Sequence, residues 1–212
     1  TTTVNWLVGS TISAVGVGFL AFIAKALGAG EQASAKRAAS QAVLAVLVVG
    51  IVVTLITVGL SGQIPKWMQV DKDIRDLAGE YFLILYLPML FRTATTIFGT
   101  VLRAAGDTKS PMKIGVVVNL VNVVLNFLLI YPTRQLTLFS YEFTMRGAGQ
   151  GVIGAAIASA IAYTVGGILI TIVLWRHPQV SPRGESLRPD VTIIRPCLRV
   201  AMPNMLLSST IC

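Results

Sequence analysis

Charge is scarce in this sequence, and it is almost missing from the long apolar stretches. Only 12% of the 212 residues are charged, about half of the fraction usual in soluble domains. Five stretches of about twenty residues or more carry almost no charge, and Arg92 is the only ionisable side chain deep inside any of them. A helix of that length spans the roughly 30 Å hydrocarbon core of a bilayer. The sequence therefore predicts an all-α, polytopic membrane protein.

Residues that commonly support catalysis are also few. The two cysteines, Cys197 and Cys212, have no metal-ligand or disulfide spacing, and the single histidine, His177, lies in a proline-containing loop. The sequence contains no HExxH motif, no Gly-x-Ser-x-Gly elbow and no paired carboxylates within a span. The glycines of residues 147–154 are not followed by Gly-Lys-Ser/Thr, which argues against a nucleotide site. We expect no enzyme activity, no metal and no cofactor.

The apolar runs divide the chain into five complete membrane helices and the start of a sixth. The helices are expected at about residues 4–26, 41–64, 76–105, 112–131 and 149–175. They form one transmembrane bundle over residues 1–176. A basic linker, 177–195, then leads to a sixth apolar run, 196–212. Residues 132–146 form a polar loop whose alternating pattern allows a small hairpin.

The basic residues are distributed unequally between the two sides of the predicted bundle. Eleven Lys and Arg residues lie near the loops after the first, third and fifth helices, and five lie on the other side. The eleven-residue side is predicted to be cytoplasmic, in a plasma membrane. The placement in short loops fits a membrane topology better than a nucleic-acid surface. The first helix then starts outside, which requires an odd number of preceding spans, and one missing helix is the simplest solution.

Two polar features interrupt the apolar spans. Asn119, Asn122 and Asn126 fall within about 60° of one another on one helix face, and no Asp or Glu lies deep inside any predicted span. Such a stripe can join neighbouring helices or form a hydrated network for an ion or substrate. Arg92 lies near mid-membrane, where an unpaired charge is costly, and we favour a structural role for it over a transport role. Pro88, one turn earlier, is predicted to kink the helix.

Several segments resemble multidrug and toxic compound extrusion (MATE) transporters. Residues 26–31 (ALGAGE) resemble the exit of that family's helix 2, and residues 102–112 (LRAAGDTKSPM) resemble the turn after its helix 4. Residues 119–126 (NLVNVVLN) resemble its helix 5, and residues 151–159 (GVIGAAIAS) its helix 6. The likeness covers nearly the whole chain in the family's order.

The resemblance implies two six-helix lobes that export organic, often cationic, compounds by alternating access, driven by a proton or sodium gradient. Residues 1–176 would then be most of a six-helix transporter lobe, 177–195 the linker between the lobes, and 196–212 the start of the first helix of the second lobe. Asn122 matches a helix-5 asparagine of the family, Asn126 falls where archaeal members often carry aspartate, and Ser159 falls where they carry threonine. The family's helix-1 aspartate is expected to lie outside this chain. The candidate ion and substrate network is therefore Asn119, Asn122, Asn126, Ser159 and Arg92. The loop 132–146 is longer than the connection common in the family.

Two other functions stay open from the sequence. A flippase for a lipid-linked sugar on a related fold would require a more cationic central cavity than Arg92 alone provides. A structural or assembly subunit would use the asparagine stripe only to hold helices together. In each case the partner is the lipid bilayer, and nucleic acid is not expected.

Overall fold

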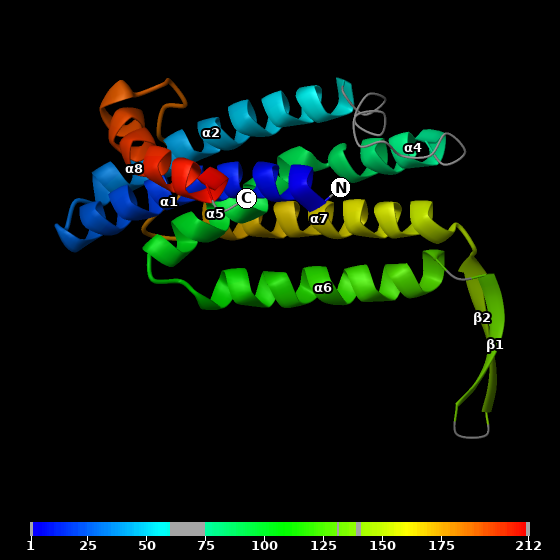
Figure 1. The fold of residues 1–212 in the computed structure, drawn as a ribbon. Coiled ribbons are helices and arrows are strands. Elements are labelled where there is room, and N and C mark those ends of the chain that lie inside the picture. Colours follow the sequence, from blue (N-terminus) through cyan, green and yellow to red (C-terminus); the bar gives the residue numbers. More distant parts are fainter. Residues whose placement is uncertain (1, 60–74, 131, 139–140, 211–212) are drawn as a thin grey trace.

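The computed structural model describes residues 2–59, 75–130, 132–138 and 141–210 as a helical bundle with one projecting hairpin (Figure 1). The helices are α1 (Thr2–Gly28), α2 (Gln32–Gly59), α4 (Arg75–Tyr86), α5 (Met89–Ala104), α6 (Lys109–Leu129), α7 (Gly151–Arg176) and α8 (Val191–Thr210). The strands β1 (Pro132–Leu138) and β2 (Tyr141–Ala148) pair antiparallel. The hairpin that the alternating pattern of this loop allows is therefore present.

Five membrane spans are supported by helix length and composition. In the described part of the chain, α1, α2, α6 and α7 are each long and apolar enough to cross a bilayer. The pair α4 and α5 counts as a fifth span, bent by 44° at the break between Tyr86 and Met89. Pro88 lies in this break, as expected, because proline lacks the N–H that continues a helical hydrogen-bond ladder. The all-α membrane bundle predicted from the sequence is confirmed.

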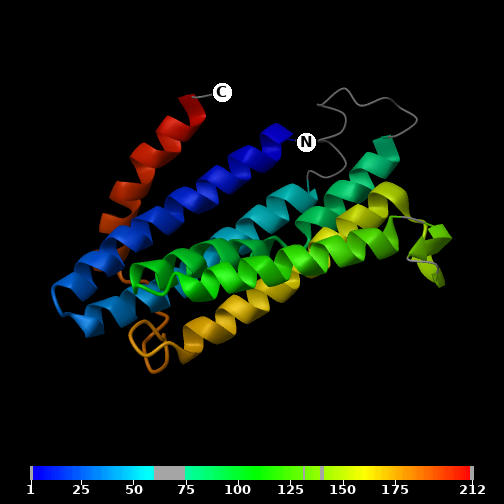
Figure 2. The ribbon, with the colours of Figure 1, turned by 90° about the horizontal axis from the view of Figure 1, so that it is seen from below.

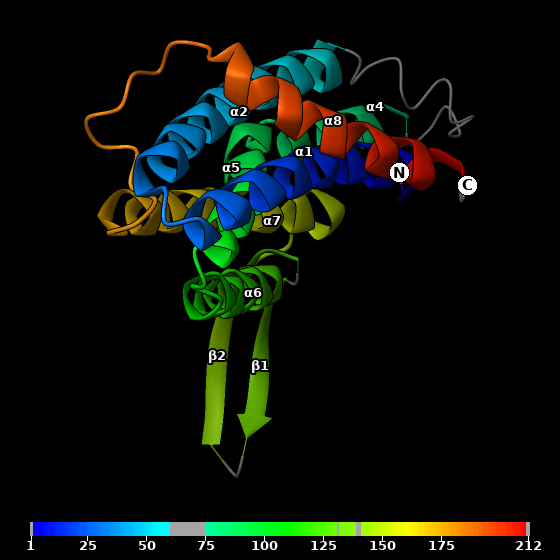
Figure 3. The ribbon, with the colours of Figure 1, turned by 90° about the vertical axis from the view of Figure 1, so that its left-hand side faces the viewer.

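The helices form layers along one common direction. Figure 3 shows the bundle near its end, with α2 and α6 on opposite sides and α1, α5 and α7 between them. Helix α5 packs against α1, α2 and α7, whereas α6 packs mainly on α7. The side chains of Ile97, Val101 and Leu102 are completely buried in α5, which is the centre of the core.

The two ends of the bundle differ in what they carry. The turns after α1 and α5 and the segment after α7 lie together at one end, and the hairpin lies at the other (Figures 1 and 2). The three basic loop regions identified in the sequence therefore share one end of the molecule.

Close helix contacts occur where the sequence is rich in small residues. A Cβ on Gly154 of α7 would lie 2.6 Å from the carbonyl oxygen of Leu129, and one on Gly167 would lie 2.7 Å from Cβ of Phe91. Only glycine permits these approaches without a shift of the neighbour. The glycines of α7 therefore let α6 and α5 approach its backbone.

Some helix ends differ from the expected positions. Helix α2 begins at Gln32 rather than near residue 41, because Ala, Gln, Lys and Arg are strong helix formers and continue the helix beyond the apolar run. Helix α8 begins at Val191 rather than at 196, directly after Asp190, whose carboxylate accepts a hydrogen bond from the Thr192 N–H (3.0 Å). The predicted span 76–105 is two helices, and its first residues extend from Arg75.

The other three helices lie close to their expected positions. Helices α1, α6 and α7 cover 2–28, 109–129 and 151–176 instead of 4–26, 112–131 and 149–175. The division into a lobe, a linker and a second-lobe helix stays a prediction.

Candidate functional site

A chain of hydrogen bonds joins α6 to α7 inside the apolar part of the bundle. The Asn122 amide nitrogen donates to the Ser159 hydroxyl oxygen at 3.2 Å, which links the two helices. The Asn126 amide nitrogen donates to the Asn122 amide oxygen at 2.8 Å, one helical turn along α6. All three side chains are half-buried. The structure thus brings together three of the five residues proposed from the sequence.

The last group in this series of hydrogen bonds is an acceptor that has no partner among the described residues. The amide oxygen of Asn126 is buried and has no hydrogen-bond partner among the described residues. A buried acceptor without a partner costs about 1–3 kcal/mol, so its presence in a native structure calls for an explanation. An amide oxygen can bind a hard cation or accept a hydrogen bond from a donor on another molecule or segment.

Arg92 of α5 contacts α7, the helix that carries Ser159. Its guanidinium carbon lies 5.3 Å from the centre of the Tyr163 ring, within the range of a cation–π interaction. Tyr163 follows Ser159 by four residues on α7, so the two side chains lie on the same face of that helix. A guanidinium nitrogen of Arg92 also lies near Gly9, where an added Cβ would be 3.8 Å away. Arg92 therefore links α5 to α7 and approaches α1.

Asn119 is the residue that the structure leaves outside the network. It lies on α6 nearer the basic end of the bundle than Asn122, and its side chain is exposed. The stripe stays a prediction: Asn122 and Asn126 are half-buried, whereas Asn119 is exposed. The grouping of Asn119 with Asn122 and Asn126 in one hydrogen-bonded set is not seen among the described residues.

Tyr163 is the functional candidate that the sequence reasoning missed. An aromatic residue in an apolar helix is unremarkable alone, and only its spacing from Ser159 could have indicated that it shares a face with the polar residues. Among the described residues, no group of three His, Cys, Asp or Glu side chains could hold a metal ion. The candidate network therefore consists of the amides of Asn122 and Asn126 and the hydroxyl of Ser159.

These features define a multi-pass integral membrane protein with a buried amide network between two of its helices. Over residues 1–128 the sequence matches the family described as MatE, and the chain belongs to this family. The resemblance seen in the sequence motifs is therefore confirmed, and members of this family are transporters rather than enzymes.

Curated relatives and solved structures agree with this assignment. The chain is 25% identical over 201 residues to a probable multidrug resistance protein NorM of Thermotoga maritima, covering 95% of this chain and 41% of the relative. It is 23% identical over 195 residues to a multidrug export protein MepA of Staphylococcus aureus, covering 91% of this chain and 40% of the relative. The chain therefore spans about two fifths of the length of the curated relatives that it matches.

The fold is also shared with transporters in different conformations. A multidrug resistance MATE family transporter in its outward-facing conformation superposes with a TM-score of 0.83 at 24% identity, over 98% of this chain and 43% of that one. An inward-facing conformation gives a TM-score of 0.81 at 23% identity, over 97% of this chain and 44% of that one. These likenesses show a common fold.

Proposed function

We propose that the full-length protein is a secondary active transporter that exports small organic compounds, cationic ones among them, by alternating access. The driving reaction is antiport of a proton or a sodium ion. The family membership and the export proteins among the relatives support this proposal. The observation that carries it is the Asn126–Asn122–Ser159 chain, which ends on a buried amide oxygen with no partner among the described residues.

The chemistry of this network suits transient binding rather than permanent attachment. Asn122 is fixed at both ends, because it donates to Ser159 and accepts from Asn126. This pairing holds the Asn126 amide in place. The Asn126 nitrogen points toward Asn122, so the Asn126 oxygen stays available. A neutral acceptor held in place in this way can coordinate a cation or accept a proton donor without a large reorganisation cost. The network itself is neutral, so we expect a carboxylate that titrates or balances the cation to come from another part of the full-length protein.

The asparagine network can be tested by double substitution in the full-length protein. The change Asn122→Leu with Asn126→Leu removes both hydrogen bonds while keeping similar volume, and we expect efflux to fall by about tenfold or more, equivalent to about 1.4 kcal/mol. Efflux of a fluorescent organic cation from cells is the measurement, normalised to the amount of protein in the membrane.

The matched control is Asn119→Leu, which changes the same residue type on the exposed part of the same helix. This variant is expected to export at the normal rate. Normal efflux by the double variant at normal expression would show that the network only holds α6 to α7. That result would favour a structural interpretation of the stripe.

A further inference from the structure

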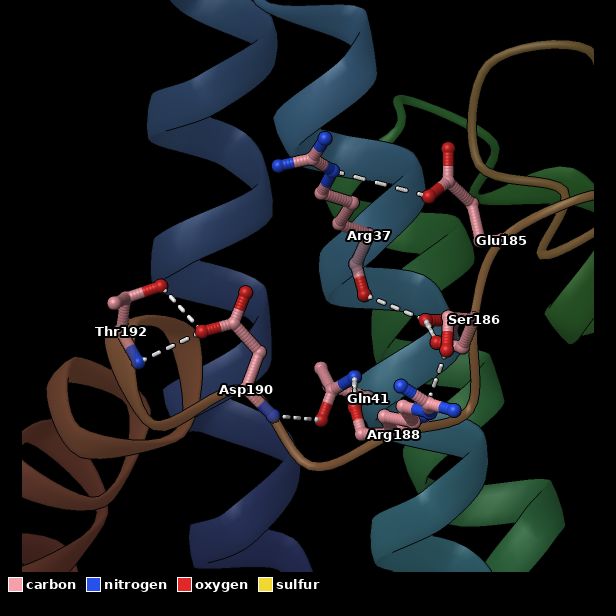
Figure 4. Close-up of polar contacts among 8 residues, drawn as sticks. Arg37, Gln41, Glu185, Ser186, Arg188, Asp190 and Thr192 are labelled. Carbon is pink, nitrogen blue, oxygen red and sulfur yellow. Dashed lines mark hydrogen bonds and ion pairs between the residues drawn. The ribbon is translucent and has the colours of Figure 1, made fainter.

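The segment between α7 and α8 is held against α2 by a side chain that binds its backbone twice. The Gln41 amide nitrogen donates to the carbonyl oxygen of Arg188 at 2.8 Å, and the Gln41 amide oxygen accepts from the N–H of Asp190 at 3.1 Å (Figure 4). Gln41 is only 3% exposed. The Gln41 amide pairs with the segment as a neighbouring strand would, so this contact involves the backbone of the segment and not its side chains.

A second buried residue strengthens the same contact. Ser40, which is 1% exposed, shares its hydroxyl proton between the carbonyl oxygens of Ser186 (3.1 Å) and Arg37 (3.0 Å). Arg37 and Glu185 add an ion pair at 3.9 Å, which is partly exposed and contributes little. We call Ser40 and Gln41, with the segment 186–190 that they bind, the linker clamp.

Helix α8 starts directly at this clamp. The N–H of Asp190 bonds to Gln41, while the carboxylate of Asp190 accepts from the N–H of Thr192 and caps the first turn of α8. One residue therefore belongs both to the clamp and to the helix start. Asp190 therefore connects the first turn of α8 to α2.

Packing along α8 shows why the clamp matters. Cys197 of α8 lies with its backbone against Gly18 of α1, at a distance that admits no side chain at residue 18. Toward α2, by contrast, α8 faces an apolar cavity of about 220 Å³ lined by residues such as Leu44, Val48 and Leu198. Side-chain packing does not fill the space between α2 and α8, so hydrogen bonds through Gln41 supply their connection.

We propose that Gln41 is a positioning residue that makes the linker and the first turns of α8 move as one body with α1 and α2. This inference rests on the proposed function, with α8 as the first helix of a second lobe. It follows that the linker is not the hinge between the lobes. The change in their relative position occurs farther along α8 than Cys197.

The proposal is tested by electron paramagnetic resonance distances in the full-length protein in lipid nanodiscs. Spin labels are placed at Ala33→Cys on α2 and Val191→Cys on α8, both exposed positions, with native cysteines replaced. A second pair joins Ala33→Cys to an exposed cytoplasmic position in the second lobe. Distances are compared at acidic and neutral pH and with and without sodium.

We expect the pair across the lobes to change its distance between these conditions while the 33–191 pair keeps one narrow distribution. In Gln41→Leu the 33–191 distribution should broaden, and in Gln41→Glu, which keeps the acceptor for Asp190, it should broaden less. The matched control is Gln32→Leu, an exposed glutamine of the same helix, which should leave the distribution unchanged.

A 33–191 distance that changes together with the pair across the lobes would overturn the proposal, because the linker would then be moving. If the distance of the pair across the lobes never changes, the proposal of alternating access fails. The linker clamp is then tested by Gln41→Leu alone. In that case a broadened distribution in Gln41→Leu supports the clamp, and an unchanged one overturns it.

Discussion

Arg92 shows how a membrane protein can keep a charge within an apolar helix. The guanidinium lies over the ring of Tyr163, and an aromatic face stabilises a cation by about 0.5–2 kcal/mol, more where water is excluded. This is a substantial part of the roughly 2.5–3.5 kcal/mol insertion cost of a central arginine. The structural role proposed for Arg92 from the sequence stays a prediction, and the ring provides a way to test it.

Removing the ring should destabilise the bundle, whereas removing only the hydroxyl should not. We expect Tyr163→Leu to lower the melting temperature and the yield of folded full-length protein, and Tyr163→Phe to keep both close to normal. Thermal unfolding of the purified protein in detergent measures this. Equal losses in the two variants would mean that the hydroxyl, and not the ring, is the important group.

Asp107 provides a second test at the level of a residue, outside the membrane. Hydrogen bonds from the Ser110 side chain and backbone hold the pKa of Asp107 below its ordinary value of 3.8, and the Ser110 N–H lies 3.0 Å from the carboxylate. A lowered pKa means that the ionised carboxylate stabilises the folded protein. That stabilisation is fully present above about pH 3.8 and is lost as the pH falls through the lowered pKa.

The carboxylate also caps the start of α6, which gives a matched pair of variants. We expect Asp107→Ala to cost about 0.5–2 kcal/mol at neutral pH, as the loss of a helix cap does. Asp107→Asn should keep most of the stability that the cap contributes, because its amide oxygen accepts the same hydrogen bond without titrating. Thermal unfolding is measured between about pH 3 and about pH 7, a range that includes carboxylate titration. Asp107→Asn should lose less stability at acidic pH than the unmodified protein.

At the scale of the elements, the contact between α6 and α7 decides the geometry of the amide network. Gly154 lies against the Leu129 carbonyl oxygen at the end where the two helices meet. We expect Gly154→Ala to push α6 away from α7, to cost about 1–3 kcal/mol as overpacking does, and to lengthen the 3.2 Å bond between Asn122 and Ser159.

Gly115→Ala is the control for this change, because nothing lies within 4 Å of a Cβ added there on α6. It should be neutral or slightly stabilising, since alanine favours a helix more than glycine does. Efflux and thermal unfolding of both variants separate the effect of crowding from that of helix propensity. A neutral Gly154→Ala would show that α6 adjusts its position freely.

The sequence predicts these elements well where one physical effect dominates. Apolar length alone located the spans, and Pro88 marked the break before α5, because a missing N–H acts locally. Helix starts were less accurate, since Lys36 and Arg37 interrupt the apolar run without interrupting the helix. Asn119 and Tyr163 could not be assigned, because a helical face shows direction but not which neighbour covers each turn.

For the whole molecule, the remaining question is which end faces the cytoplasm. The basic loop regions lie at one end of the bundle (Figure 2), and we expect that end to be cytoplasmic. A cysteine at the exposed Glu31 should resist a membrane-impermeant maleimide in intact cells, and a cysteine at the exposed Gln150 should react. The reverse pattern would contradict the assignment, and permeabilised cells provide the control in which both react.

The position of α6 at the edge of the bundle has a consequence for biosynthesis. Alone in lipid, α6 would present Asn122 and Asn126 to hydrocarbon, and α7 would present Ser159, each with polar groups that lipid cannot satisfy. Together the two helices hydrogen-bond Asn122 to Ser159, while α6 makes few contacts with the rest of the bundle. The two segments are therefore suited to leave the translocon as a pair.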